Sequence, residues 1–275
     1  DAEEWEVEAI REEYGLNKPI IVQYVDYMVK LFKGDMGRSM KSDTPVTELI
    51  ADRMPQTLKL VFAGVLWAPV LGIFIGVISA IKHGKMLDHV SMLIAITGLS
   101  APGFWLGLMG IQIFSVQLGW LPSGGMTTLG TSGGAADVAA HMVMPVIVLA
   151  VSMAGTNIRY IRSAVLEILQ QDYLRTARAK GIGHFLVINK HALRNALVPI
   201  VTVIGMEIPV LFGGSIIVEQ VFSWPGLGLM TMSAITNRDY PVIMGVCLLS
   251  AIVVLLGNLL TDILYAVVDP TIKLQ

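Results

Sequence analysis

Hydrophobic residues in this chain form long, almost uninterrupted stretches, unlike the short alternating runs of a soluble domain. A helix needs about 20 mostly apolar residues to cross the hydrocarbon core of a bilayer, which is about 30 Å thick. Five stretches are long enough, and they cover residues 57–81, 87–118, about 142–161, 199–222 and 241–267. The pattern therefore predicts an all-α fold, a polytopic membrane helix bundle with five spans.

The second stretch is too long for one straight span and carries Pro102-Gly103 at its centre. Proline removes a backbone donor and disrupts the helix, so we expect a kink or break there. A break inside a membrane is tolerated only where protein or a water-filled cavity satisfies the freed backbone groups. Ser100, Pro102, Phe104 and Trp105 are therefore candidates to line a pathway, although the two aromatic residues could equally fill the bundle.

Glu207 lies near the middle of the fourth stretch. An unpaired charge at that depth costs roughly 3 kcal/mol on insertion scales. We expect Glu207 to be neutral, paired or facing water, and we favour the pathway over a structural hydrogen bond to a neighbouring helix.

Charged residues indicate which side of the membrane each loop occupies. Only 15% of the residues are charged, against about 25% in a typical soluble domain. The turn after the first span holds Lys82 and Lys85, and residues 159–194 hold seven bases against two acids. Since basic loops stay in the cytoplasm, we expect both segments inside and residues 1–56 outside. The net charge of −2 gives no indication of a nucleic-acid partner.

Residues 1–56 are expected to form an extracytoplasmic helical segment. Apolar residues recur at helical spacing between residues 21 and 32, and Thr44-Pro45 begins a short amphipathic piece. This segment could lie flat on the membrane as a lid or could bind a partner. Five spans leave the termini on opposite sides, with the C-terminus inside. Since no span in this sequence could have carried residues 1–56 outward, we also expect a sixth span ahead of Asp1.

The loop between the third and fourth spans is basic and rich in small residues. Ala177, Ala179, Gly181 and Gly183 would let another backbone approach closely, and apolar residues on either side predict a helix, a short turn and a second helix. The bases could serve only to set topology, but topology alone does not explain the small residues.

The sequence of this loop resembles that of a known family. DYLRTARAKG at 172–181, followed by HALRNALVP at 191–199, is similar to the cytoplasmic "EAA" loop of ABC importer permeases in the peptide, glutathione and nickel branch. SAPGFWLG at 100–107 and VEQVFSWPGLG at 218–228 also resemble that branch, and the resemblance covers essentially the whole chain. Arg175 replaces the usual Glu, and Leu193-Arg194 replaces a Leu-Pro pair, which fits the peptide variant.

The resemblance implies a type I ABC importer transmembrane domain over residues 57–275, with a cytoplasmic coupling loop at about 162–198. It implies a homologous second permease subunit, two ATPase subunits and an extracytoplasmic substrate-binding protein, in a bacterial or archaeal plasma membrane. The short helix in the loop would dock into the ATPase. The residues that the resemblance assigns to this contact are Asp172, Tyr173, Arg175, Thr176, Ala177, Arg178, Ala179, Lys180 and Gly181.

Function is expected to be import of small peptides by alternating access, with glutathione or a nickel chelate as the alternative cargo. The chain lacks the phosphate-binding G-x-x-x-x-G-K-[ST] pattern, so ATP and magnesium would bind to the partner subunits, with no cofactor here. Neither catalytic nor metal-binding residues are assigned. An ion-coupled carrier is a remote alternative, because it would need more intramembrane charge and usually inverted repeats.

Two smaller expectations concern single side chains. Cys247, the one cysteine, lies in an apolar run, where core packing is its expected role. Trp224 follows the fourth span within Trp224-Pro225-Gly226, where we expect a rigid turn with the indole anchored at the membrane interface.

Overall fold

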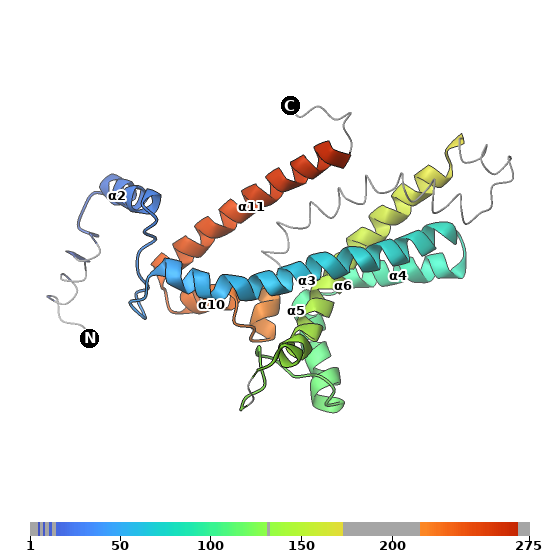
Figure 1. Ribbon diagram of the computed structural model, residues 1–275, viewed down its shortest axis with the longest axis horizontal. Coiled ribbons are helices and arrows are strands. Elements are labelled where there is room, and N and C mark those ends of the chain that lie inside the picture. Colours follow the sequence, from blue (N-terminus) through green and yellow to red (C-terminus); the bar gives the residue numbers. More distant parts are fainter. Residues whose placement is uncertain are drawn as a thin grey trace.

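The computed structural model describes residues 5, 8, 11–12, 15–130, 133–172 and 215–268, with side chains placed as far as residue 263. These residues are almost entirely helical (Figure 1). The named elements are α2 (Ile20–Phe32), α3 (Val46–Ile81), α4 (Met86–Ser100), α5 (Gly103–Gly110), the π-helical η1 (Ile111–Gln117), α6 (Ala135–Leu169), α10 (Leu227–Thr236) and α11 (Tyr240–Val268).

Among the described residues, α3, α6 and α11 are long and apolar enough to cross a membrane. The bent pair formed by α4 and α5–η1 would be a fourth span. Four of the five predicted stretches are therefore found as helices. The remaining one, the fourth stretch at 199–222, lies mostly outside the described residues, and its last part is helical over 215–221.

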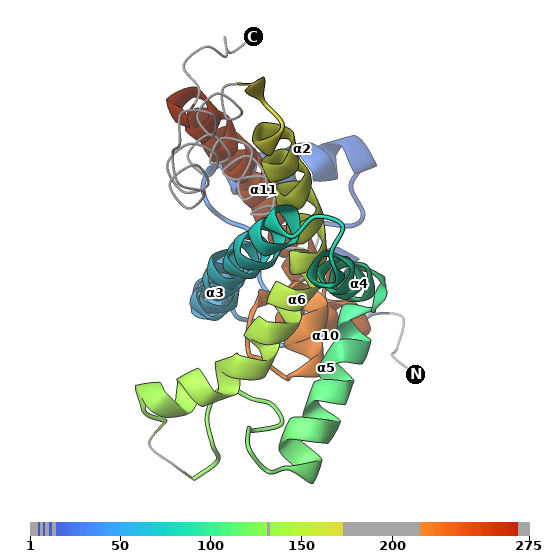
Figure 2. The same ribbon diagram turned by 90° about the vertical axis from the view of Figure 1, so that its right-hand side faces the viewer.

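The predicted break in the second stretch is confirmed. The helix axis turns by 101° between α4 and α5, and Figure 2 shows α5 running away from the end of α4. Pro102 has no N–H to donate and has an extended ψ of 132°, so α4 ends before it and α5 begins after it.

Helix α3 begins earlier than hydropathy predicts. It starts at Val46, directly after Pro45, and continues through Pro55 to Ile81. The amphipathic piece predicted separately is thus the first part of the spanning helix, and residue 56 lies inside it. Helix α6 is likewise longer than the predicted 142–161, because polar residues such as Asp137 and Arg162 belong to its outer turns.

The centre of the bundle is the contact of α6 with α3 and α4 (Figure 1). Small residues permit this close packing. A Cβ on Gly72 of α3 would lie 2.4 Å from the Cβ of Asn157, and one on Gly155 of α6 would lie 2.5 Å from the carbonyl oxygen of Ala95 in α4. Such spacing is typical of helix interfaces in membranes, where small residues let backbones approach.

The first turns of α3 pack against α10 and the first turns of α11. The cluster between them includes Val46, Ile50, Leu227 and Val246. Farther along α11, many apolar side chains are exposed on this single chain. Cys247 is among the exposed residues, so its expected role in core packing was wrong. Helix α2 buries no residue at all.

Candidate functional site

The predicted ATPase contact begins at Asp172, just after α6 ends. Asp172 is described and follows the end of α6 at Leu169. The other residues assigned to this contact, 173 and 175–181, lie outside the described residues, as does Glu207. What the structure does show is how the base of this loop is held.

Arg162 of α6 forms a two-pronged ion pair with Asp88 at the start of α4. Its Nε donates to Asp88 Oδ1 at 2.7 Å, and one terminal nitrogen donates to Oδ2 at 2.8 Å. Two parallel bonds of this kind fix the orientation of both groups as well as their distance. The pair joins residues that are 74 positions apart in sequence.

Asp88 accepts further hydrogen bonds from the end of α3 and from the turn between α3 and α4. Ser79 Oγ donates to Oδ1 at 2.5 Å, and the Gly84 backbone N–H donates to Oδ2 at 2.9 Å. The His83 ring lies 3.2 Å from Oδ2 and is largely exposed. The Asp88 side chain itself is only 3% exposed, and a carboxylate this deeply buried requires such a complete set of donors.

Apolar contacts surround this polar group. Ala80 of α3 packs with Ile161, Val165 and Ile168 of α6, and all four are buried. The cytoplasm-facing ends predicted for α3, α4 and α6 are thus joined by one hydrophobic cluster and one buried ion pair.

The predicted pathway residues Ser100, Pro102, Phe104 and Trp105 lie at the break between α4 and α5 and are all exposed on this chain. Phe104 and Trp105 are 49% and 50% exposed. The two aromatic rings therefore do not fill the core of this subunit. Their contact with a transported molecule stays a prediction.

At the other end of the molecule, Glu219 binds the start of α10. One carboxyl oxygen accepts hydrogen bonds from the backbone N–H groups of Gly228 at 2.6 Å and Leu229 at 3.2 Å. The other accepts one from Thr57 Oγ1 at 2.8 Å, and Ser215 is a further donor. The Glu219 side chain is fully buried. It accepts hydrogen bonds from backbone N–H groups that have no partner within the helix, because they belong to its first turn.

Glycines make room for this carboxyl group. A Cβ on Gly226 would lie 2.4 Å from Glu219 Oε2, and one on Gly228 would lie 2.5 Å from the Cα of Ile216. Glycine is therefore required at both positions, because the backbone at the start of α10 lies directly against the buried Glu219 carboxyl group and Ile216.

Trp224 is enclosed by the protein and is not exposed to its surroundings. It is fully buried, and its indole N–H donates to the carbonyl oxygen of Gln56 at 2.9 Å. The expectation of an interfacial anchor was wrong, because the turn folds the indole inward against α3.

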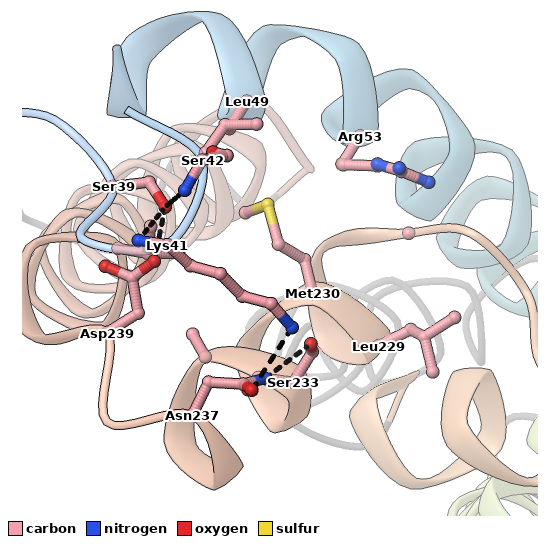
Figure 3. Close-up of a pocket in the computed structure, with 13 residues that line it drawn as sticks. Ser39, Lys41, Ser42, Leu49, Arg53, Leu229, Met230, Ser233, Asn237 and Asp239 are labelled. Carbon is pink, nitrogen blue, oxygen red and sulfur yellow. Dashed lines mark hydrogen bonds between the residues drawn. The ribbon is translucent and has the colours of Figure 1, made fainter. Parts of the chain in front are cut away.

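A pocket of about 300 Å³ opens beside α10 (Figure 3). Ser39 Oγ donates to Asp239 Oδ2 at 2.5 Å, and the Met40 N–H donates to Oδ1 at 3.1 Å. Across the pocket, Lys41 Nζ donates to Asn237 Oδ1 at 3.2 Å. These bonds fasten the loop before α3 to the turn between α10 and α11.

The loop that carries Ser39 is closed by Arg38 and Asp43. The Arg38 Nε donates to Asp43 Oδ1 at 2.8 Å. This guanidinium holds the pKa of the exposed Asp43 carboxyl below its usual value, first through the hydrogen bond and then through its charge.

Comparison with known proteins places the chain in a family. A family model described as the binding-protein-dependent transport system inner membrane component matches residues 72–274. The chain belongs to this permease family. A second model, described as the N-terminal part of such membrane components, matches residues 2–61. The protein is therefore a multi-pass component of the inner membrane, and the predicted family is confirmed.

Individual relatives agree with this assignment. The permease is 46% identical over 264 residues to the oligopeptide transport system permease protein AppB of Bacillus subtilis, covering 95% of this chain and 83% of that protein. It is 42% identical over 267 residues to the glutathione transport system permease protein GsiC of Pectobacterium atrosepticum, covering 97% and 84%.

Among solved structures, the MetNI methionine ABC transporter in an inward-facing conformation matches the permease with a TM-score of 0.67 at 22% identity, over 81% of this chain and 97% of that one. This likeness confirms the predicted fold, a helical ABC transporter membrane domain.

Two polar groups of the permease were missed by sequence reasoning. Arg162 was counted only as one of the bases of residues 159–194, Asp88 was not considered, and no short motif links the two. Glu219 was overlooked in favour of Glu207, because it precedes the start of α10 at Leu227 by eight residues, which is outside the spacing of the usual capping motifs.

Proposed function

We propose that this permease is one of two membrane-spanning subunits of an ATP-driven importer of small peptides. The observation that carries the proposal is the 46% identity to an oligopeptide permease over 95% of this chain. Relatives named as glutathione permeases point the same way, because glutathione is itself a tripeptide.

The partners follow from the family. A homologous second subunit would complete the translocation pathway, an external binding protein would deliver the peptide, and two ATPase subunits would bind residues 172–181 of the coupling loop. ATP binding on those subunits would bias a two-state helix bundle through the loop, so that the pathway opens alternately to either side.

The proposed orientation places the turn at 82–85 and the end of α6 in the cytoplasm. Sequence reasoning assigned both basic segments to that side independently. Their proximity supports the assignment, since Arg162 of α6 contacts both Asp88 and His83 beside the turn. Residues 38–45, at the other end of α3, would then lie outside.

Glutathione import is the second candidate, because GsiC of Pectobacterium atrosepticum is 42% identical. The two candidate functions are distinguished by reconstituting the permease with its second subunit, both ATPases and its binding protein in liposomes. Uptake of a labelled alanine tripeptide or tetrapeptide is measured with and without ATP, in competition with reduced glutathione.

We expect ATP-dependent uptake of the labelled peptides, with weak competition by glutathione. Uptake of glutathione and not of the other peptides would assign the second candidate. Absence of ATP-dependent uptake of either would contradict the proposed function.

A further inference from the structure

The buried ion pair between Asp88 and Arg162 lies on the part of α6 that leads to the predicted ATPase contact. Arg162 is within the last two turns of α6, which runs on to Leu169 and then into the predicted coupling loop. Seven residues of helix span about 10 Å at 1.5 Å per residue. Figure 1 shows the end of α6 passing the turn between α3 and α4.

Apolar packing holds α3, α4 and α6 together, but it restricts their movement along one another less than a directional bond does. The α3–α6 contact elsewhere relies on small residues, such as Gly72 and Gly76 facing Asn157 and Ile158. Close packing of this kind resists separation of the helices, and a hydrogen-bonded ion pair adds a restraint on orientation that apolar contacts lack.

The Asp88–Arg162 pair adds the missing directional restraint. A guanidinium fork with bonds of 2.7 and 2.8 Å to one carboxylate tolerates little sliding or rotation. The carboxylate cannot turn to follow a moving arginine, because Ser79 of α3 and the Gly84 N–H hold it from the other side. Movement of the end of α6 must therefore carry the α3–α4 turn with it.

We propose that Asp88 and Arg162 are positioning residues that make the end of α6 and the α3–α4 hairpin one rigid body, so that force received at the coupling loop moves the α4–α5 break. This rests on the proposed function, in which ATPase subunits act on the loop. The pair contacts no nucleotide and no cargo; it determines how much transport each hydrolysed ATP produces.

The first test uses the reconstituted importer with Arg162→Lys. Lysine keeps the charge but cannot form the two-pronged contact. We expect the complex to assemble and to hydrolyse ATP at a near-normal basal rate, while peptide molecules transported per ATP hydrolysed fall about 10-fold. Arg162→Gln combined with Asp88→Asn should lose no more coupling than Arg162→Gln alone, because the pair acts as a unit.

The matched control is His83→Ala. His83 touches the same carboxylate and one terminal nitrogen of Arg162, but it is largely exposed, and its removal leaves both bonds between Arg162 and Asp88 in place. It should transport normally. A purely structural role of the pair would instead lower the yield of assembled complex, and the transport per ATP of the assembled fraction would stay unchanged; that result would overturn the proposal.

A second measurement needs no change to the pair. Lys85 and Gln170 are exposed on the two elements that it joins, and both can be replaced by cysteine for spin labelling in a Cys247→Ala background. We expect the distance between the labels to stay constant between nucleotide-free and ATP-bound complexes, while the distance from residue 85 to a label on an ATPase subunit changes.

A change in the 85–170 distance on ATP binding would overturn the rigid-body inference even if Arg162→Lys failed to assemble. Failure of the proposed function is distinguishable, because wild-type complex would then show neither ATP-dependent uptake nor an ATP-dependent change in any labelled distance.

Discussion

Removal of the Glu219 carboxyl group should destabilise the end of the bundle that contains α10, by an amount that its contacts determine. Glu219→Gln keeps the shape of the side chain but replaces one acceptor oxygen with a donor. If the remaining oxygen stays on the Gly228 and Leu229 N–H groups, the amide nitrogen faces the Thr57 hydroxyl, whose O–H then loses the oxygen to which it donated at 2.8 Å. One hydrogen bond is lost, which corresponds to about 1–2 kcal/mol.

Glu219→Ala should cost more. It leaves the N–H groups of Gly228 and Leu229 buried without an acceptor, at about 1–3 kcal/mol each, and it adds a cavity. At about 2–4 °C per kcal/mol for a chain of this size, the glutamine variant should lower the melting temperature by roughly 2–8 °C and the alanine variant by at least twice as much.

The assay is thermal unfolding of the detergent-solubilised subunit, followed by the loss of its monodisperse peak in size-exclusion chromatography. Glu167→Gln, at an exposed glutamate of α6, is the control and should not change the melting temperature. Equal melting temperatures for wild type, Glu219→Gln and Glu219→Ala would refute the assignment of Glu219 as the cap of α10.

Two further predictions concern the helix interface. Gly155→Val should prevent α6 from packing on α4, because even its Cβ would lie 2.5 Å from the Ala95 carbonyl oxygen; the readout is loss of folded subunit from the membrane fraction, and wild-type yield would contradict it. Asn157→Ala should be neutral or stabilising, because within the described part of the chain both amide atoms of this fully buried side chain lack a hydrogen-bond partner. A melting temperature lowered by more than a few degrees would show that Asn157 has a partner after all.

The elements could be predicted from the sequence where hydropathy and backbone chemistry agree. The end of α3 at Ile81 and the break at Pro102 follow from an apolar run that stops and a proline that cannot donate. The start of α3 and the ends of α6 were placed too narrowly, because hydropathy detects the lipid-facing middle of a helix and not its polar first and last turns.

The buried polar groups could not be predicted in the same way. The contact of Asp88 with Arg162 depends on how α4 and α6 pack, and this is decided by small residues such as Gly155 that carry no sign of the ion pair. Trp224 was assigned to the membrane interface on residue type alone, whereas its hydrogen bond to Gln56 depends on a turn whose direction Glu219 sets.

The central claim is that separate ATPase subunits drive this permease through the coupling loop. Its most direct test measures ATP hydrolysis and peptide uptake together in proteoliposomes for wild type and for Ala177→Glu, with Ser42→Ala in the loop before α3 as the control. The account predicts that Ala177→Glu inserts normally but loses both uptake and the hydrolysis stimulated by loaded binding protein, while the control retains both. Normal ATP-driven uptake by Ala177→Glu would contradict it.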